Sequence, residues 1–373
     1  MSGIEFASGI YVPVPRGGGK LRDPARFDRA LPRDVDVPAA LASKYALRPG
    51  AFVYGPAGKS PAPGQPTRLE DVLAIERLIP DDYHAIERFD DQTAIDPSER
   101  LVLETDAKPL GPRVVDLLAP IGRGQRGLIV APPRTGKTIL LRQFADAITK
   151  NHPEIAVFVL LVDERPEEVT ETRRETKGIV SASSSDRDPE EHIALAELVF
   201  ERCKRLAEIG RHVVLLLDSL TRLARAYNKM SNTGRTMTGG VDIKALDVPK
   251  RLFGSARTLE HGGSLTVLAS VLVDTGSRMD ELIFQEFKGT GNMEFVLDRK
   301  LADRRVWPAV DIAQSGTRKE ERLLAPETLA AITLLRRTLA DMDNTVAIEK
   351  LVEQLEKHPT NAAFLERIGS FKQ

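Results

Sequence analysis

Hydrophobic residues form long continuous runs in the second part of the chain and only short runs in the first. Four long runs, at 128–130, 156–162, 213–217 and 265–273, alternate with segments in which apolar residues recur at helical spacing. Such runs are typical of strands that are buried on both faces of a parallel sheet. The pattern therefore predicts an α/β domain of strands and helices in alternation.

The pattern also predicts where the domains lie. Residues 1–85 are rich in Pro and Gly and hold short β-type runs, so we expect a small β-domain there. A polar linker is expected over 86–112 and the α/β domain over 113–373. From Pro326 onward, apolar residues at helical spacing predict C-terminal helices that pack on this domain.

Composition excludes some classes of protein and leaves others open. The 373 residues include 53 basic and 54 acidic side chains, so affinity for nucleic acid would depend on local clusters of charge. A single cysteine, Cys203, excludes an internal disulfide, and its helical context suggests a packed, inert thiol. No apolar run approaches a membrane span and the N-terminus lacks an export signal, so we expect a cytoplasmic protein.

A phosphate-binding loop with one substitution follows the first long run. The stretch APPRTGKT begins at Ala131, where the usual pattern has a glycine, so this position must keep ordinary backbone angles. A strand precedes the loop and a helix follows it, and the unpaired N–H groups at a helix N-terminus favour an anion. Gly136 lets the backbone approach phosphate, and Lys137 supplies a positive charge. Thr138 offers a hydroxyl to Mg²⁺, and Arg134 adds a second cation.

Two later runs end in acidic residues. Asp218 follows the third run, at the carboxyl end of a predicted strand, where it can hold Mg²⁺ opposite Thr138. Glu164 ends the second run and can orient a water molecule for attack on the γ-phosphate. Glu167 and Glu168 are better explained as first-turn acids that complement a helix dipole. This arrangement predicts an ATP hydrolase rather than a protein that only binds nucleotide.

Several long motifs together resemble the bacterial transcription termination factor Rho family. They are APPRTGKT, LLVDERPEEVTE, LLLDSLTRLARAYN, TMTGGVD, DTGSRMDELIFQEFKGTGNME and RVWPAVDIAQSGTRKEE, and the resemblance is close from about residue 105 to the end. It implies a RecA-like homohexameric ATPase that is stimulated by single-stranded RNA, threads RNA through its ring and pulls transcripts from RNA polymerase. The phosphate loop with Ala131 is that family's own form.

The resemblance also implies roles for individual residues. Lys137, Glu164 and Asp218 would act on ATP and its Mg²⁺, with Glu164 as the general base. Arg305 and Arg318 would reach the γ-phosphate held by a neighbouring subunit, and Trp307 would stack on adenine. The implied nucleotide contacts are Gly122, Arg123, Gly124, Gln125, Arg126, Gly127, Arg134, Thr135, Gly136, Lys137, Thr138, Ile139, Arg165 and Trp307.

RNA contacts are expected in two places. Two loops would line the channel of the ring, the first with Arg235 and the second with Arg278 and Lys288. The N-terminal part resembles the family's OB-type barrel, which holds single strands on exposed aromatic rings. Here glycine and Lys20 replace two of these rings, and Asp36 stands where a tyrosine is expected. We therefore expect a weak or altered primary RNA site that depends on Lys20 and Arg22.

Three other functions stay open at this point. A rotary or export ATPase shares the PIGRGQRG segment, although the Pro-Pro loop and the GTGNME segment oppose it. A regulator could bind nucleotide and RNA without unwinding. A purely structural protein fits least, because the acids and arginines described above are not needed for packing.

Overall fold

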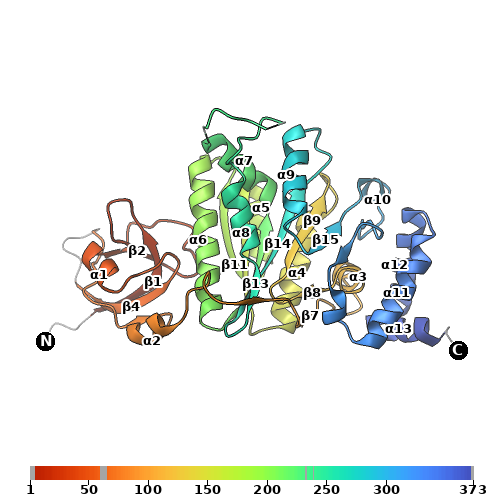
Figure 1. Cartoon of the computed structure of the whole chain (residues 1–373), viewed down its shortest axis with the longest axis horizontal. Helices are drawn as coiled ribbons and strands as arrows, with labels where there is room; N and C mark the ends of the chain where they lie inside the picture. Colours follow the sequence, from red (N-terminus) through yellow and green to blue (C-terminus); the bar gives the residue numbers. More distant parts are fainter. Residues whose placement is uncertain (1–4, 59–64, 232, 238, 371–373) are drawn as a thin grey trace.

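The computed structural model describes residues 5–58, 65–231, 233–237 and 239–370. Along its longest axis, the N-terminal β-domain lies at one end, the α/β domain in the middle and the last three helices at the other end (Figure 1). No helix within the described ranges is long and apolar enough to cross a membrane.

The N-terminal domain is an antiparallel sheet that closes on itself. Its strands are β1 (Glu5–Pro13), β2 (Gly19–Arg22), β3 (Val35–Val37), β4 (Phe52–Ala57) and β5 (Ala74–Ile75), in the order β3-β2-β1-β4-β5. The segment 67–70 joins the sides, because Asp36 N donates to Thr67 O (2.8 Å) and Glu70 N donates to Pro56 O (2.9 Å). Two short helices, α1 (Ala39–Lys44) and α2 (Pro80–Ala85), complete this barrel.

The larger sheet has the predicted parallel strands. They are β9 (Arg126–Ala131), β10 (Ala156–Glu164), β11 (Ile179–Ser184), β12 (His212–Asp218), β14 (Ser264–Leu272) and β15 (Met293–Val296). Their order is β11-β10-β12-β14-β9-β15, and β16 (Gly316–Thr317) adds an antiparallel edge. The predicted α/β class, with a β-domain before it, is confirmed.

Helices cover both faces of this sheet because its strands are apolar on both sides. In β9, Ile129 packs in one core with Phe144, whereas Leu128 packs in the other core with Phe200. The covering helices are α4 (Lys137–Asn151), α5 (Pro166–Glu175), α6 (Pro189–Glu208), α7 (Leu220–Met230), α8 (Asp247–Gly254) and α9 (Arg278–Lys288). Cys203 of α6 is fully buried, which raises the pKa of its thiol.

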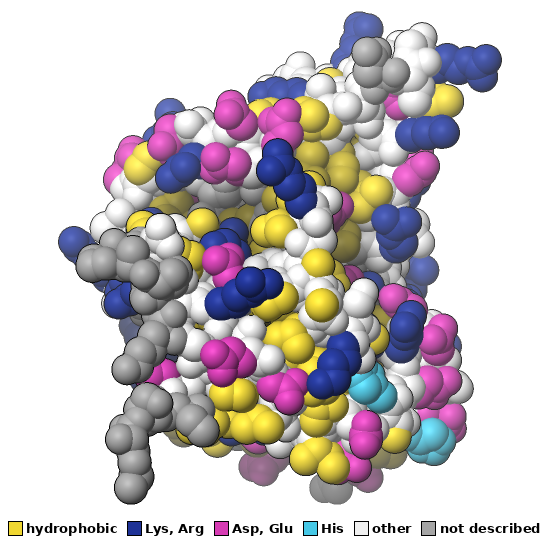
Figure 2. All heavy atoms as spheres, turned by 90° about the vertical axis from the view of Figure 1, so that its left-hand side faces the viewer, with side chains coloured by type: hydrophobic (Ala, Val, Ile, Leu, Met, Phe, Trp, Pro, Cys, Tyr) yellow, Lys and Arg dark blue, Asp and Glu magenta, His cyan; other side chains and the backbone are white. Residues whose placement is uncertain are grey.

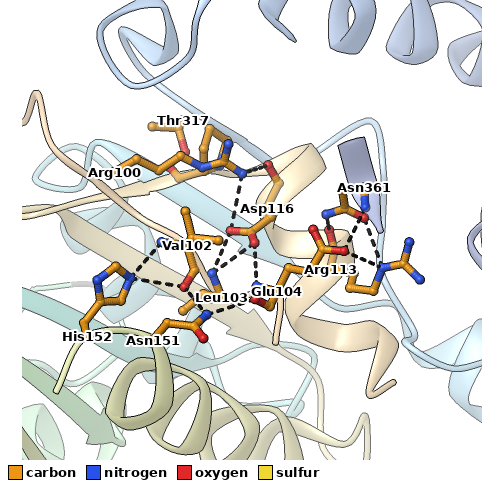
Figure 3. A network of polar contacts seen from close by, with 11 residues as sticks. Arg100, Val102, Leu103, Glu104, Arg113, Asp116, Asn151, His152, Thr317 and Asn361 are labelled. Atoms are coloured by element: carbon orange, nitrogen blue, oxygen red, sulfur yellow. Dashed lines mark hydrogen bonds and ion pairs between the residues drawn. The ribbon is translucent and has the colours of Figure 1, made fainter. Parts of the chain in front are cut away.

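The linker forms short strands that pair with strands of the α/β domain. Its short strands β6 (Ala94–Ile95) and β7 (Arg100–Leu101) pair with β13 (Arg257–Leu259) and β8 (Ile121–Gly122). Helix α3 (Leu110–Leu118) follows, and its Asp116 accepts hydrogen bonds from the backbone N–H groups of Leu103 (3.0 Å) and Glu104 (2.7 Å) (Figure 3). These bonds hold the linker against α3.

The C-terminal helices form as predicted and are fixed to α3. They are α11 (Pro326–Ala340), α12 (Asn344–Lys357) and α13 (Asn361–Ser370), preceded by α10 (Arg299–Asp303) and the 3₁₀ turn η1 (Glu320–Arg322). The fully buried Arg113 donates from Nε to Asn361 Oδ1 (3.2 Å) (Figure 3) and from Nη1 to Leu355 O (2.9 Å). A buried arginine is tolerated where such acceptors surround it.

The barrel is held against the α/β domain by polar and aromatic contacts. Phe27, in the loop after β2, is buried edge-on against Phe158 of β10, with ring centroids 6.4 Å apart. The neighbouring Asp28 forms an ion pair with Arg173 of α5. Arg48 Nη1 lies 2.9 Å from Glu208 Oε1 of α6. The loop that follows the predicted RNA strand β2 is therefore part of the junction between the two domains.

Candidate nucleotide and RNA sites

The backbone of the phosphate loop accommodates alanine at position 131. Ala131 is the last residue of strand β9, and the left-handed positions are Arg134 (φ 63°) and Gly136 (φ 81°). Gly136 precedes α4 directly and accepts from Leu140 N (3.0 Å), while Thr135 Oγ1 donates to Pro132 O (2.7 Å). The substitution at Ala131 is thus accommodated, and the first N–H groups of α4 are available to an anion.

Lys137 at the start of α4, Glu164 at the end of β10 and Asp218 at the end of β12 lie close together. Lys137 Nζ lies 3.6 Å from Glu164 Oε1 and forms an ion pair with Asp218. Ser270 Oγ of β14 donates to Asp218 Oδ1 (2.8 Å), and Arg222 Nη2 of α7 lies 3.3 Å from Glu164 Oε2. Parallel strands end at one edge of a sheet, so acids at the ends of β10 and β12 meet there.

Burial raises the proton affinity of Glu164 in this cluster. Removal from water raises the pKa of Glu164 to about 7, and the negative charge of Asp218 adds to the effect. Lys137 and Arg222 act in the opposite direction. Glu164 thus exchanges its proton near neutral pH, as a general base requires.

The oxygen ligands expected for Mg²⁺ lie side by side. Thr138 and Asp218 line the same small hollow beside α4. Within the described residues, no group of three or more His, Cys, Asp and Glu side chains could hold a metal alone. Two such oxygens suit Mg²⁺, which binds proteins through one or two oxygen ligands and takes the rest from phosphate and water.

An apolar cavity of about 450 Å³ opens from the phosphate loop. Trp307 stands on one side of it, 43 % exposed, with its six-membered ring packed on Gly136. Ile139 of α4, 54 % exposed, lines the same cavity. The predicted platform for a base therefore lies next to the predicted phosphate site. Arg134 and Arg165 are both exposed at this edge of the sheet.

The structure does not bring residues 122–127 to this cavity. They lie at the amino end of β9, and the six-residue strand separates them from the loop by about 17 Å. Arg123 is paired there with Glu99 (3.1 Å) and Glu154 (2.7 Å), and Gln125 donates to Asn292 Oδ1 (2.6 Å). The expected contact between this segment and the nucleotide of its own subunit is therefore wrong, because β9 runs from this segment toward the phosphate loop and holds the two apart.

The two arginines expected to act across subunits lie at opposite edges of the sheet. Arg305 is exposed two residues before Trp307, near the cavity. Arg318 follows β16, and its N–H donates to Asn292 O (2.9 Å) at the amino end of β15. Its side chain is exposed and forms no hydrogen bond or ion pair with another described residue. Arg318 is therefore free to contact another subunit but not its own phosphate loop.

Both predicted channel loops are tied to helix α7. Asn228 Oδ1 accepts from Asp242 N (2.7 Å) in the first loop, in which Arg235 is exposed and positions 232 and 238 lie outside the described residues. Arg225 Nε donates to Asp280 Oδ1 (2.8 Å) just after the second loop, where Arg278 is exposed. The two loops lie at the same end of the molecule (Figure 1).

Lys288 does not belong to the second loop. It is at the other end of α9, about 15 Å from Arg278, because eleven residues form a continuous helix between them. It lies 3.7 Å from Glu294 and over the ring of Phe284. The helix thus removes Lys288 from the predicted RNA contact.

Both predicted RNA cations of the barrel are already paired. Lys20 Nζ lies 2.7 Å from Asp36 Oδ1, and these residues are direct partners on β2 and β3. Arg22 donates to Phe27 O (3.1 Å), and its Nε lies 3.8 Å from Asp34. On the barrel side of the molecule, basic and acidic side chains alternate among apolar ones (Figure 2). Among the described residues of this face, basic side chains are not gathered into a uniform groove.

Two functional neighbours were not expected from the sequence. Arg222 could have been proposed from its position in the first turn of α7, four residues after β12 ends at Asp218. Gln143 lines the cavity beside Trp307, and only the packing of α4 against α3 reveals it.

Comparison with known proteins places this geometry in a family. A family model described as "ATP synthase alpha/beta family, nucleotide-binding domain" matches residues 111–317. A transcription termination factor Rho of Streptosporangium roseum is 53% identical over 97% of this chain and 94% of its own length. The chain belongs to the transcription termination factor Rho family. Rho of Streptomyces coelicolor is 50% identical over 98% of this chain and 86% of its own length.

Other relatives are longer, and solved structures agree on the fold. Rho of Streptomyces lividans is 52% identical over 90% of this chain, which spans 48% of that relative. An ATPase of a bacterial type III secretion system superposes with a TM-score of 0.63 at 23% identity, covering 75% of this chain and 86% of its own. At that identity the likeness shows the RecA-like fold alone, so it does not favour an export ATPase over Rho.

Proposed function

We propose that this Rho-family chain is an RNA-dependent ATPase that moves 5′ to 3′ along single-stranded RNA, unwinds RNA duplexes and releases transcripts from RNA polymerase. Family membership supports ATP hydrolysis directly. The geometry brings Glu164, Lys137 and Asp218, which we propose as base, cation and metal ligand, into one cluster, and this cluster is the observation that carries the proposal.

The roles in hydrolysis follow from the cluster. The N–H groups at the start of α4 and Lys137 bind the β- and γ-phosphates of ATP. Glu164 accepts a proton from the attacking water, and Arg222 holds the carboxylate in place. Bound to Thr138 and Asp218, Mg²⁺ would neutralise charge on the phosphate oxygens. Lys137 is paired with both acids, so a bound phosphate would compete with them for its ammonium group.

Assembly supplies the remaining charge. Arg318 is exposed at the edge of the sheet opposite its own phosphate loop, so a head-to-tail ring would bring it to the γ-phosphate of the next subunit. Its planar, permanently charged fork suits the transition-state oxygens. We propose a homohexamer with RNA in its central channel, contacted by Arg235 and Arg278.

The direct test is ATP hydrolysis with and without single-stranded RNA, at protein concentrations that allow assembly. We expect RNA to increase turnover many-fold, and Lys137→Ala to abolish it under both conditions. Turnover that RNA leaves unchanged would contradict the proposal.

One observation favours a second candidate. The paired cations of the barrel would suit a regulator that binds nucleotide and RNA weakly and does not unwind. Displacement of the DNA strand from an RNA–DNA hybrid in the presence of ATP separates the two, because only the translocase releases it.

A further inference from the structure

Strand β10 contains one extra residue just before the proposed base. In its register with β11, Val162 pairs with Ser183 and the next pair joins Glu164 to Ser184. Asp163 is the additional residue between these two pairs, and it has a left-handed backbone (φ 57°). A bulge of this kind bends a strand and changes the direction of the side chain that follows it.

The extra residue decides on which face of the sheet Glu164 lies. Side chains alternate along a strand, and Leu161 packs in the core with α4 whereas Val162 packs in the core with α6. Strict alternation would therefore place Glu164 with Val162, on the face of α6. The bulge at Asp163 returns Glu164 to the face of α4, where Lys137 Nζ lies 3.6 Å from its carboxylate.

One buried histidine lies against both strands at this bulge. His192 of α6 is 5 % exposed, and its Nδ1 lies 2.7 Å from Ser183 Oγ of β11. Its Nε2 lies 4.0 Å from Asp163 Oδ1 of β10. Because a carboxylate only accepts, the tautomer that serves both neighbours has its proton on Nε2 and accepts from the serine hydroxyl at Nδ1. Burial lowers the pKa of His192, so the ring is neutral at neutral pH.

We propose that His192 is a positioning residue for hydrolysis: it fixes Asp163 in the bulge and thereby keeps Glu164 on the face of α4. The inference rests on the proposed function, in which Glu164 accepts a proton from the attacking water. Helix α6 lies on the other face of the sheet, so His192 acts through the strand and does not touch the nucleotide.

The test is single-turnover ATP hydrolysis by the full chain with saturating ATP and RNA. His192→Asn should lower the rate about tenfold, because catalysis depends steeply on the placement of the reacting groups. ATP affinity should match that of the parent, since Lys137 and the start of α4 are unchanged. His192→Gln should restore most of the rate, because its amide nitrogen reaches the place of Nε2, whereas that of asparagine reaches only the place of Nδ1.

His212→Asn is the matched control. This histidine also contacts a serine, with its Nδ1 3.0 Å from Ser264 Oγ, but it lies at the amino end of β12, away from the phosphate loop. The control should hydrolyse ATP at the rate of the parent.

A second readout separates positioning from a general loss of structure. If His192 acts through Glu164, His192→Asn should lower the rate no further in a Glu164→Gln background, because two residues that act as a unit are not additive. Independent losses that multiply in the double variant would overturn the inference. A parent-like rate in His192→Asn, or equal losses in His192→Asn and His192→Gln, would do the same.

The outcomes also separate this inference from the proposed function, which a parent unable to hydrolyse ATP would contradict. Should His192→Asn fail to fold, Asp163→Val tests the same contact from the strand, where the side chain is 38% exposed and little packing is lost. Its β-branched side chain disfavours the left-handed backbone, so it should show the same loss of rate at unchanged ATP affinity. A parent-like rate in Asp163→Val would then refute the role of the bulge.

Discussion

The phosphate-loop edge of the sheet and the N-terminal barrel both pair lysine with acidic side chains, but they differ in burial and in origin. At the sheet edge, Lys137 meets acids from separate strands, and Glu164 and Asp218 are 3% and 1% exposed. In the barrel, Lys20 meets its direct cross-strand partner Asp36, and both are over one-third exposed. Buried opposite charges that face a cavity are costly unless a ligand uses them, whereas an exposed pair contributes little.

This contrast supports the proposal of a functional ATPase site together with a weakened primary RNA site in the barrel. The variants below are ordered from the largest expected effect to the smallest, and each one tests one side of the comparison.

Arg318→Ala should lower RNA-stimulated turnover by about 10³-fold, the usual contribution of an arginine supplied from a neighbouring subunit. Nucleotide affinity should stay close to that of the parent, because Arg318 lies away from its own phosphate loop. Steady-state hydrolysis and nucleotide titration measure the two quantities, with Arg337→Ala on α11 as a surface control. Full activity in Arg318→Ala would contradict the proposal that Arg318 acts on the nucleotide of the next subunit.

Glu164→Gln should lower kcat by about 10²-fold or more, because the amide cannot accept the proton of the attacking water. ATP binding should survive, since the phosphate contacts of Lys137 are unchanged. Single-turnover hydrolysis with saturating ATP isolates this step. A kcat within a few-fold of the parent would show that Glu164 is not the base.

The pH dependence follows from the raised pKa of Glu164, about 7. The ionised, base-competent form increases as pH rises, so kcat should grow about tenfold between pH 6 and 8.

Stability has the opposite trend: the raised pKa means that the folded state favours the neutral carboxyl. That contribution is lost as pH rises from the ordinary value of 4.5 to about 7. Thermal unfolding should show Glu164→Gln more stable than the parent at pH 8, with the difference vanishing near pH 4.

Arg278→Ala should reduce stimulation by RNA about tenfold and leave nucleotide affinity unchanged, because the side chain is exposed at the first residue of α9 and does not line the cavity beside Trp307. Lys288→Ala is the matched control at the other end of the same helix, and its effect should be small. Equal RNA stimulation in Arg278→Ala and the parent would refute the contact.

Asp36→Tyr should strengthen binding of a pyrimidine oligoribonucleotide about fivefold, because it frees Lys20 and adds one stacking ring worth about 1 kcal/mol. Asp36→Ala frees the lysine without the ring, and the difference between the two variants isolates stacking. Fluorescence anisotropy of labelled RNA measures both. No gain in either variant would show that the barrel is not limited by this pair.

Much of the motor site could be predicted from the sequence because its determinants are local. A strand, a glycine-lysine-threonine loop and a helix follow one another in the chain, and acids at strand ends meet for topological reasons. Ala131 and Gly136 accordingly have the backbone that the loop pattern required. The parallel sheet followed from its apolar runs for the same reason.

The predictions that were wrong or incomplete concern contacts between residues that are far apart in the chain. The direction of β9 carries residues 122–127 away from the loop, and the continuity of α9 carries Lys288 away from Arg278. Strand register alone determines that Lys20 faces Asp36, and only the packing of α3 on α4 exposes Gln143 to the cavity. None of these contacts has a local signature in the chain.

The central claim is that ATP is held between Lys137 of one subunit and Arg318 of the next. The most direct measurement mixes Arg318→Ala with Lys137→Ala, each inactive alone, and follows single-turnover ATP hydrolysis in the presence of RNA. Random mixed rings would contain complete interfaces at about one quarter of the positions, so we predict a burst of about one quarter of the parent amplitude. A mixture that stays as inactive as its components, although both variants bind and co-assemble, would contradict the account.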